Sequence, residues 1–263
     1  MTSVTGTAIA RRPRAFVRVD GPDAEDYLQR LLSNDVGVLA PGDSLEALLL
    51  TPKARVIAPM VVLRRGPEDF LLLTEPELGE PLREHLTRMR FRARCEIEPE
   101  EHTSVVVFGG EQGIPTRDYG APAVEVLDAA VEPTLADEEL ELRRIEAGTP
   151  RFGREIDDRV LPAEAGLTAT HVSFGSRCYP GQEPVVRLQS RGHANRGLRV
   201  LELDAAELPE YDAELSLDGK PVGRVTSTAR RPDGSIVALG YVRVEVPADA
   251  VLELPGGKAR SLH

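Results

Sequence analysis

The chain has 263 residues, enough to bury a substantial core as one large domain or as two or three small ones. Its 41% apolar and 29% charged residues are typical of a globular protein. With 32 basic against 43 acidic side chains the formal charge is −11, which argues against a surface built throughout to hold nucleic acid, because phosphate binding requires Lys and Arg.

Cysteine content and hydropathy bear on metal binding and on the compartment. Cys95 and Cys178 lack the paired spacing of a zinc or iron–sulfur site, and the five histidines are scattered. The sequence shows no disulfide framework, no secretory signal and no apolar run of the length that spans a bilayer. We therefore expect a soluble, cytoplasmic protein without a stably bound metal.

The first elements in chain order are a strand and an amphipathic helix. Residues 1–14 are polar and are predicted to be a loose terminus. Residues 15–19 form the predicted strand, and the turn at residues 20–23 caps the helix that follows. That helix would bury four side chains on one face: Tyr27, Leu28, Leu31 and Leu32.

The middle of the chain predicts an antiparallel sheet with one more helix. Apolar runs at residues 45–50, 55–63 and 69–74 are typical of neighbouring strands. A helix over residues 77–89 has leucines at four-residue intervals, and the stretches that return as strands are 91–98 and 103–108. Together these elements indicate an α+β fold.

A further helix, over residues 134–148, has consistent signals at both ends. Three acids fill its first turn, Arg143 and Arg144 its last, and Gly148 stands where a left-handed C-terminal residue belongs. Periodicity does not explain Glu146. That carboxylate is either a solvated surface group or the partner of a hydrogen-bonding ligand.

The next segment places Cys178 directly before the turn Pro180-Gly181. Residues 182–188 are predicted to begin a helix that carries a proline in its first turn. The helix dipole and the flanking Arg177 and Arg187 would favour thiolate over thiol, which makes a cysteine a nucleophile or a metal ligand. The alternative is that Cys178 is a small buried apolar residue, as most free cysteines are.

An arginine-rich run extends from this cysteine segment. It contains one acid, Glu183, and five arginines: Arg177, Arg187, Arg191, Arg196 and Arg199. Such a run is either a solvated face or a surface for an anionic ligand or a protein partner.

Beyond residue 199 the pattern changes to short strands. The alternating runs are 199–203, 214–217, 221–228, 236–246 and 251–254. Asp218-Gly219 and Asp233-Gly234 are hairpin signals. The sequence therefore predicts a small antiparallel barrel over residues 196–263, preceded by an α+β region, with one or two subdomains, over residues 1–195.

Two blocks of the chain are similar to the T-protein of the glycine cleavage system, an aminomethyltransferase. The first runs from Arg144 to Ile156 as Arg-x-Glu-Ala-Gly-x-Pro-x-Phe-Gly-x-Glu-Ile and continues in residues 161–167; the second is the hairpin at residues 218–227. The resemblance implies a T-protein-like folate-binding fold with Glu146 beside the pterin of tetrahydrofolate. A carboxylate suits that role because it can accept two N–H groups from the pyrimidine edge.

The segment Cys-Tyr-Pro-Gly-Gln-Glu, Cys178 to Glu183, resembles the signature Lys-Gly-Cys-aromatic-x-Gly-Gln-Glu of the YgfZ family. These folate-binding relatives of the T-protein assist iron–sulfur protein maturation and, through it, tRNA modification. Ser176-Arg177 replaces the family's Lys-Gly. The resemblance implies that Cys178 reacts and that five neighbours shape its loop: Arg177, Tyr179, Gly181, Gln182 and Glu183.

The arginines one helical turn apart, Arg187 and Arg191, would then bind an anion, either the folate glutamate tail or the acidic face of a partner. The partners that the resemblance implies are a reduced folate, as tetrahydrofolate or a one-carbon derivative, and iron–sulfur client proteins or their assembly machinery. We expect a monomer, with no direct nucleic-acid binding and no membrane association. Whether Cys178 faces the folate cavity is open at this point.

Three hypotheses for function follow. The first is a tetrahydrofolate-binding factor for iron–sulfur cluster assembly or repair, in which a partner or a small thiol completes the ligands that one thiolate cannot supply. The second is tetrahydrofolate-dependent aminomethyl transfer, which is disfavoured because T-proteins carry Ile-Asp-Asp where residues 56–60 of this chain read Val-Ile-Ala-Pro-Met. The third is a folate-binding domain without chemistry.

Overall fold

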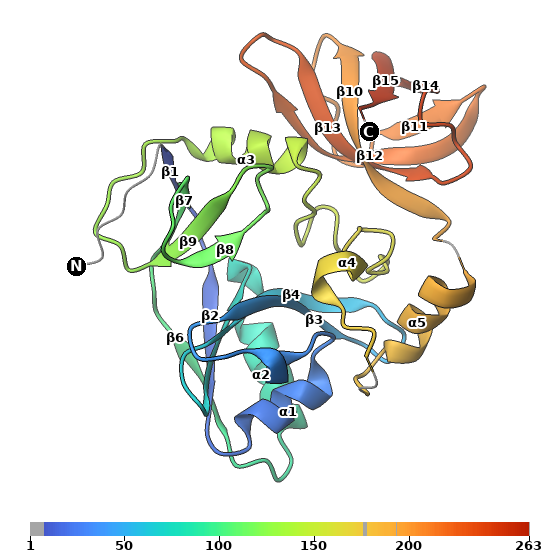
Figure 1. Cartoon of the computed structure of the whole chain (residues 1–263). Helices are drawn as coiled ribbons and strands as arrows, with labels where there is room; N and C mark the ends of the chain where they lie inside the picture. The colour runs from blue at the N-terminus through green and yellow to red at the C-terminus, as the bar shows by residue number, and fades with distance from the viewer. Residues whose placement is uncertain (1–7, 176–177, 193, 263) are drawn as a thin grey trace.

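A computed structural model describes residues 8–175, 178–192 and 194–262. Figure 1 shows that its strands form three separate β structures. They are a five-stranded sheet, a four-stranded sheet and a closed barrel of six strands. All the strand pairings that build them are antiparallel. The predicted α+β fold and the C-terminal barrel are therefore confirmed.

The five-stranded sheet carries most of the amino-terminal core. In the order β3-β4-β5-β2-β6 its strands are β2 (Ala15–Asp20), β3 (Ser44–Leu50), β4 (Val56–Arg64), β5 (Asp69–Thr74) and β6 (Glu96–Glu100). The helices α1 (Ala24–Leu31) and α2 (Gly79–Met89) bury their leucines on it, and the short helices η1 (Val36–Val38) and η2 (Pro76–Leu78) lie beside them. The periodicity that predicted both helices corresponds to these buried faces.

The strand predicted over residues 91–98 is wrong in its first half. Residues 91–95 form a turn in which Phe91 has a φ of 46°. The backbone N–H of Arg94 donates to the Asp23 carboxylate at 2.8 Å. A side chain from before α1 thus takes the place of a neighbouring strand, and β6 begins only at Glu96.

The four-stranded sheet has the order β1-β7-β9-β8. Its strands are β1 (Ala8–Arg11), β7 (Ser104–Phe108), β8 (Ile114–Thr116) and β9 (Ala123–Leu127). The prediction of a loose terminus is wrong for Ala8–Arg11, because this segment pairs with β7 along its whole length. A strand of four residues carries too little pattern of its own, and its partner comes from far along the chain.

Helix α3 (Asp137–Glu146) joins this sheet to the barrel. On one side Leu140 packs with Phe108 of β7, and on the other Ile145 packs with Val237 and Leu239 of the barrel. Gly148 ends the helix with a φ of 74°, as its position predicted.

The barrel has the circular order β10-β13-β12-β11-β14-β15. Its strands are β10 (Arg196–Ala205), β11 (Glu214–Leu217), β12 (Lys220–Arg230), β13 (Ile236–Arg243), β14 (Val251–Leu254) and β15 (Gly257–Ser261). Asp218 and Gly219 both have positive φ, the backbone that a two-residue hairpin requires. Two short helices, α4 (Thr168–His171) and α5 (Gln182–Arg191), precede the barrel (Figure 1).

Candidate functional site

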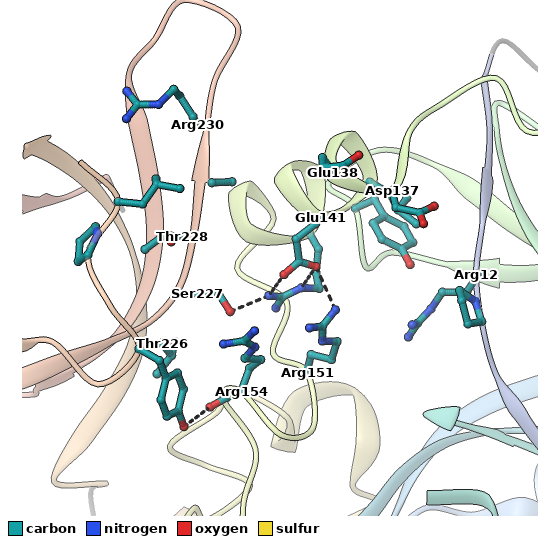
Figure 2. Close-up of a pocket in the computed structure, with 18 of the residues that line it drawn as sticks. Arg12, Asp137, Glu138, Glu141, Arg151, Arg154, Thr226, Ser227, Thr228 and Arg230 are labelled. Carbon is teal, nitrogen blue, oxygen red and sulfur yellow. Dashed lines mark hydrogen bonds and ion pairs between the residues drawn. The ribbon is translucent and has the colours of Figure 1, made fainter. Parts of the chain in front are cut away.

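A cavity of about 780 Å³ lies where α3, the end of β1 and strand β12 of the barrel meet (Figure 2). Its volume is in the range of pockets that enclose a small organic ligand. Segments far apart in the sequence line it: residues 11–13, Tyr119, one side of α3 from Asp137 to Arg144, residues 151 and 154, residues 208–211 and residues 226–230. The fold, and no single motif, therefore builds this site.

Arg144 of α3 is the centre of a buried hydrogen-bond network in the cavity wall. Its guanidinium makes two hydrogen bonds to the carboxylate of Glu141, one turn earlier, at 2.8 and 2.9 Å. It also donates to Glu155 at 3.1 Å and to the hydroxyl of Ser227 on β12 at 2.9 Å. Burial alone would lower the pKa of Arg144, but these carboxylates outweigh it and the pKa is raised.

Glu155 completes that network from the loop after α3. The side chain is fully buried and accepts hydrogen bonds from the Ser227 hydroxyl at 2.7 Å and the Arg151 backbone N–H at 3.0 Å. Its backbone carbonyl accepts from the hydroxyl of Tyr241 at 2.9 Å. Through its carboxylate and its backbone carbonyl, Glu155 thus connects α3, the loop after it and two strands of the barrel.

Arg12 lines the cavity from the amino-terminal side. It forms a two-point ion pair with Glu75 at 2.7 and 3.1 Å. The Nε–H of Arg12 is buried and has no acceptor among the described residues. A buried donor without a partner is unfavourable, so a ligand with an oxygen acceptor would be stabilised here.

Aromatic side chains supply flat apolar surface. Tyr119 and Tyr211 both line the cavity, and the guanidinium of Arg154 lies 5.7 Å from the centre of the Tyr211 ring. Burial raises the pKa of Tyr119 to about 12, so its hydroxyl is protonated at neutral pH. A planar ring system fits such a wall, with the arginines providing its polar contacts.

A second, much smaller cavity of about 60 Å³ adjoins the first, sharing Arg12, Tyr119 and Arg144 with it. Pro59 and Met60 of β4 line it. Its volume is that of about two water molecules. Neither side chain offers a proton donor or acceptor to whatever occupies this space.

Cys178 is exposed, whereas Cys95 is buried, and neither forms a disulfide. The thiol stands before α5, the helix that the Pro180-Gly181 turn predicted. The predicted loop residues differ in exposure: Glu183 is exposed and Gln182 half-buried, whereas Tyr179 is buried and its hydroxyl has no acceptor among the described residues. Burial raises the pKa of Tyr179.

The cysteine loop packs on the turn between β3 and β4. Gly181 has a φ of 84°, and a Cβ on it would lie 2.5 Å from the carbonyl oxygen of Thr51. Ala54, in the same turn, also has a positive φ. The cysteine loop, residues 178–183, is therefore in contact with residues 51–54, directly before the segment 56–60 that the resemblance singled out.

Glu146 does not line the large cavity. It is exposed and forms an ion pair with Arg231, in the turn between β12 and β13, at 2.6 Å. None of the described residues from Cys178 to Arg187 lines the cavity either. Arg177 lies outside the described residues, and for Arg191 only its place at the end of α5 is described.

Several residues of the cavity were missed at the sequence level. Arg144, and Glu155 that supports it from behind the wall, lie inside the T-protein-like block, where only Glu146 was predicted to contact a ligand. The spacing of Glu141 and Arg144 was an available signal, since residues three apart on a helix lie side by side. For Arg12 and Tyr211 no local pattern indicated a site.

Two properties of the described residues bear on the other predictions. No group of three or more His, Cys, Asp or Glu side chains among them is arranged to hold a metal ion. None of the helices that they form is both long and apolar enough to cross a membrane.

Comparison with known proteins gives distant homologues and a shared fold. No family model matches the chain. It is 24% identical to the tRNA-modifying protein YgfZ of Escherichia coli O6:H1, across 94% of this chain and 91% of that protein, and 24% identical to YgfZ of Shigella dysenteriae, across 98% and 94%. An uncharacterized protein of Haemophilus influenzae is 25% identical across 81% of this chain and 79% of its own length.

A solved structure of the glycine cleavage system aminomethyltransferase T from Bartonella henselae superposes on 98% of this chain and 86% of its own, with a TM-score of 0.80 and 21% identity. The chain is therefore a distant homologue of the YgfZ proteins along nearly its whole length, and it has the fold of the aminomethyltransferase. The recognition made from residues 178–183 and the T-protein-like blocks is confirmed.

Proposed function

We propose that this chain is a tetrahydrofolate-binding, YgfZ-like factor that assists iron–sulfur cluster assembly or repair and, through it, tRNA modification. The observation that carries the proposal is the cavity of about 780 Å³ on an aminomethyltransferase fold, with a buried, unpartnered donor on Arg12 and aromatic walls. The homologues named as tRNA-modifying proteins supply the process in which it acts.

The lining residues fit a reduced folate. Its planar head has a hydrogen-bonding edge that would meet Arg12 and the hydroxyl of Tyr119, and its ring face would lie against Tyr211. Arg144 is already neutralised by Glu141 and Glu155, so it would hold the shape of the wall without adding net charge. When bound, the folate would supply its one-carbon chemistry; the protein residues would orient it and exclude water.

Cys178 would act apart from this cavity. Its exposure before the first turn of α5 suits a thiolate that makes transient contact with a cluster, a metal or a disulfide on a partner. One thiolate cannot complete a cluster's ligand set, so a client protein or a small thiol would provide the other ligands. The exposed position of Cys178 also allows a client protein to approach the thiol.

Aminomethyl transfer is the less favoured candidate. The strand β4 presents Ala58, Pro59 and Met60, and Pro59 and Met60 face the small inner cavity. None of these side chains can take or give a proton. A positioned general acid or base commonly contributes about 10²- to 10⁴-fold to the rate of a reaction, and its loss costs on the order of that factor. Ammonia release from an aminomethylated lipoyl protein would restore this candidate.

Folate binding is tested by calorimetry with 5-formyltetrahydrofolate on the wild type, Tyr211→Ala and Glu146→Ala. We expect Tyr211→Ala to weaken binding about tenfold, because the ring loses its stacking surface. Equal affinity of Glu146→Ala would remove Glu146 from the site, whereas a comparable loss would keep the role that the resemblance gives it. No binding by the wild type would refute the proposed cofactor.

The role of Cys178 is tested in a bacterial strain that lacks its own YgfZ-family protein. We expect wild type and Cys95→Ala to restore tRNA modification and Cys178→Ser to fail. In the purified protein, iodoacetamide at neutral pH should modify Cys178 faster than it modifies free glutathione, while burial protects Cys95 and raises its pKa. Full rescue by Cys178→Ser, with folate binding intact, would leave the third hypothesis, a folate-binding domain without chemistry.

A further inference from the structure

A second cavity, which we call the barrel cavity, has a volume of about 580 Å³ and is built almost entirely from the barrel. Residues 195–196, residues 221–224 of β12 and the end of β13 line it. One of these is Arg196, from the arginine-rich run that the sequence left as either a solvated face or an anion-binding surface. The barrel cavity shares no lining residue with the cavity proposed for the folate, so a ligand here would be bound in addition to the folate.

The strand register places three arginines of the barrel cavity on one face of the sheet. Arg224 of β12 lies opposite Tyr241 of β13, and Arg196 of β10 lies opposite Arg243 of β13. Residues two apart on a strand point to the same face, so these four side chains share a face. Val242, between Tyr241 and Arg243, packs in the cluster inside the barrel. The shared face is therefore the outer one.

The three guanidiniums are concentrated around one tyrosine. That of Arg196 lies 5.0 Å from the centre of the Tyr241 ring, and that of Arg224 lies 5.5 Å from it. Arg243 stands directly across from Arg196, and like charges in this position on neighbouring strands repel each other. An anion placed among the three arginines would be attracted by all of them and would offset that repulsion.

Most of the carboxylates that pair with these arginines lie outside the wall of the barrel cavity. Arg196 pairs with Glu164 at 3.1 Å, and Arg224 pairs with Asp212, yet neither carboxylate lines the cavity. Among the described residues that do line it, the one acid is Glu245, which is exposed. The wall therefore presents three positive charges and one negative charge to a ligand.

Arg224 also has a donor that the protein does not use. Its Nη2 is buried without a hydrogen-bond acceptor among the described residues, since Asp157 lies 3.9 Å away, within ion-pair range but too far to accept. Asp157 instead accepts a hydrogen bond from Arg159 at 2.7 Å. A buried donor without a partner is unfavourable, so an oxygen acceptor brought to this wall would be stabilised.

We propose that the barrel cavity is a binding site for a phosphate group, either as the free ion or on a small organic molecule. A phosphate group offers at least three oxygens and can contact three guanidiniums at once, whereas a carboxylate offers two. The volume of the cavity is in the range of sites for small organic ligands, and Pro221 and Val222 add apolar surface beside the arginines. There is thus room for an organic group attached to the phosphate.

A nucleic-acid strand fits the barrel cavity less well than a small phosphate. Its further phosphates would lie on the protein surface around the cavity, and the chain as a whole has a net charge of −11. A single phosphate can contact the three arginines alone.

The test is calorimetry on the full chain, in a buffer free of phosphate and sulfate, with ribose 5-phosphate, inorganic phosphate and ribose. We expect ribose 5-phosphate to bind with a Kd of about 0.1 mM and ribose not to bind, because charge-assisted hydrogen bonds to the phosphate supply most of the affinity. Arg224→Gln should weaken binding about tenfold, and Arg243→Gln about threefold because its side chain is the more exposed.

Arg260→Gln is the matched control, because Arg260 is exposed on β15 and does not line the barrel cavity; it should bind as the wild type does. Arg243→Gln removes an exposed side chain, so it tests the site even if Arg224→Gln fails to fold. Tighter binding of ribose 5-phosphate than of inorganic phosphate would support the inference with an organic phosphate as the ligand, and equal binding would support it with the free ion.

A Kd above about 1 mM for both phosphates would overturn the inference, as would an affinity that Arg224→Gln and Arg243→Gln both leave unchanged. Binding of a single-stranded oligonucleotide in place of both small phosphates would also overturn it, in favour of nucleic acid. Because the two cavities share no lining residue, none of these results bears on the proposed folate site.

Discussion

Gly181 is the residue on which the geometry of the cysteine loop depends. Its φ of 84° is a conformation that side chains other than glycine rarely adopt, and the carbonyl of Thr51 occupies the space of a Cβ. The constraint links the loop of Cys178 to the turn between β3 and β4. A change at this position therefore affects the thiol without touching it.

We predict that Gly181→Ala destabilises the protein by about 1–3 kcal/mol more than Gly256→Ala does, because only the first adds a clash to the cost of positive φ. Gly256 is a matched control, with a φ of 80° and no atom within 4 Å of its Cβ position. Urea unfolding gives both free energies. Equal losses for the two variants would mean that Thr51 moves away at no cost.

Glu155 is the buried carboxylate on which the cavity wall depends. We predict that Glu155→Gln lowers the free energy of unfolding by about 2–4 kcal/mol, because the buried Arg144 loses one of its two carboxylate partners. Glu245→Gln, which breaks an exposed pair with Arg243, should cost less than about 0.5 kcal/mol. A Glu155→Gln variant as stable as the Glu245→Gln variant would contradict this account of the wall.

The sequence predicted one kind of site residue and missed another. Cys178 was predicted as a candidate because a cysteine before a Pro-Gly turn has a chemical meaning that its neighbours determine locally. Glu155 and Arg12 were not, because their roles arise from partners more than sixty positions away, such as Ser227 for the first and Glu75 for the second. The residues adjacent to Glu155 and Arg12 in the sequence therefore do not predict these contacts.

At the scale of elements, the linker between β6 and β7 joins the five-stranded to the four-stranded sheet through one histidine. His102 contacts Asp128, just after β9, at 2.7 Å through Nδ1 and Glu100 of β6 at 2.9 Å through Nε2. Both ring nitrogens can donate to carboxylates only when the imidazole is charged. Partial burial lowers the pKa of His102, but Asp128 and Glu100 outweigh it and the pKa is raised.

A raised pKa in the folded state means that the contribution of His102 to stability is complete below its ordinary pKa of 6.5 and is lost as the pH rises through the folded value. We therefore predict that the stability difference between wild type and His102→Gln is larger at pH 5.5 than at pH 8.5. Urea unfolding at the two values measures it. Both carboxylates keep their charge over this range, since the Arg65 hydrogen bond lowers the pKa of Glu100 to about 2 and His102 lowers that of Asp128. A difference that does not change with pH would show that the ring is neutral in the fold.

Elements with a strong pattern of their own were predicted, and those that depend on a distant partner were not. Leucine periodicity gave α2, and the acids of the first turn, the arginines of the last turn and Gly148 gave α3, which begins three residues after its predicted start. The strands β1, β8, β9 and β15, three to five residues long, went unpredicted, whereas the equally short β11 and β14 were predicted from their alternating pattern. The sequence pattern also did not predict which elements pack against α3, namely the four-stranded sheet on one side and the barrel on the other.

At the scale of the whole molecule, the barrel and the rest of the chain share a buried interface. Leu239 of β13 is fully buried there in the cluster that includes Ile145 of α3, whereas Leu215 of β11 is fully buried inside the barrel. The two leucines differ in what they hold together. One joins the barrel to α3, and the other holds the barrel to itself.

We predict that Leu239→Ala and Leu215→Ala each lower the free energy of unfolding by about 2–5 kcal/mol. Only Leu239→Ala should also speed backbone hydrogen exchange in α3 under native conditions, because it loosens the contact that covers that helix. Hydrogen exchange read by mass spectrometry on peptides of α3 makes the comparison. Equal exchange in the two variants would mean that α3 is held without the barrel.

The position of β15 in the barrel determines when the barrel can fold during synthesis on the ribosome. This strand hydrogen-bonds to β10 on one side and β14 on the other, so the ring cannot close until residues 257–261 have been made. Until then the apolar side of α3 that carries Ile145 lacks its cover. A nascent chain therefore carries an uncovered apolar surface from the synthesis of α3 to that of β15, and a chaperone would bind there.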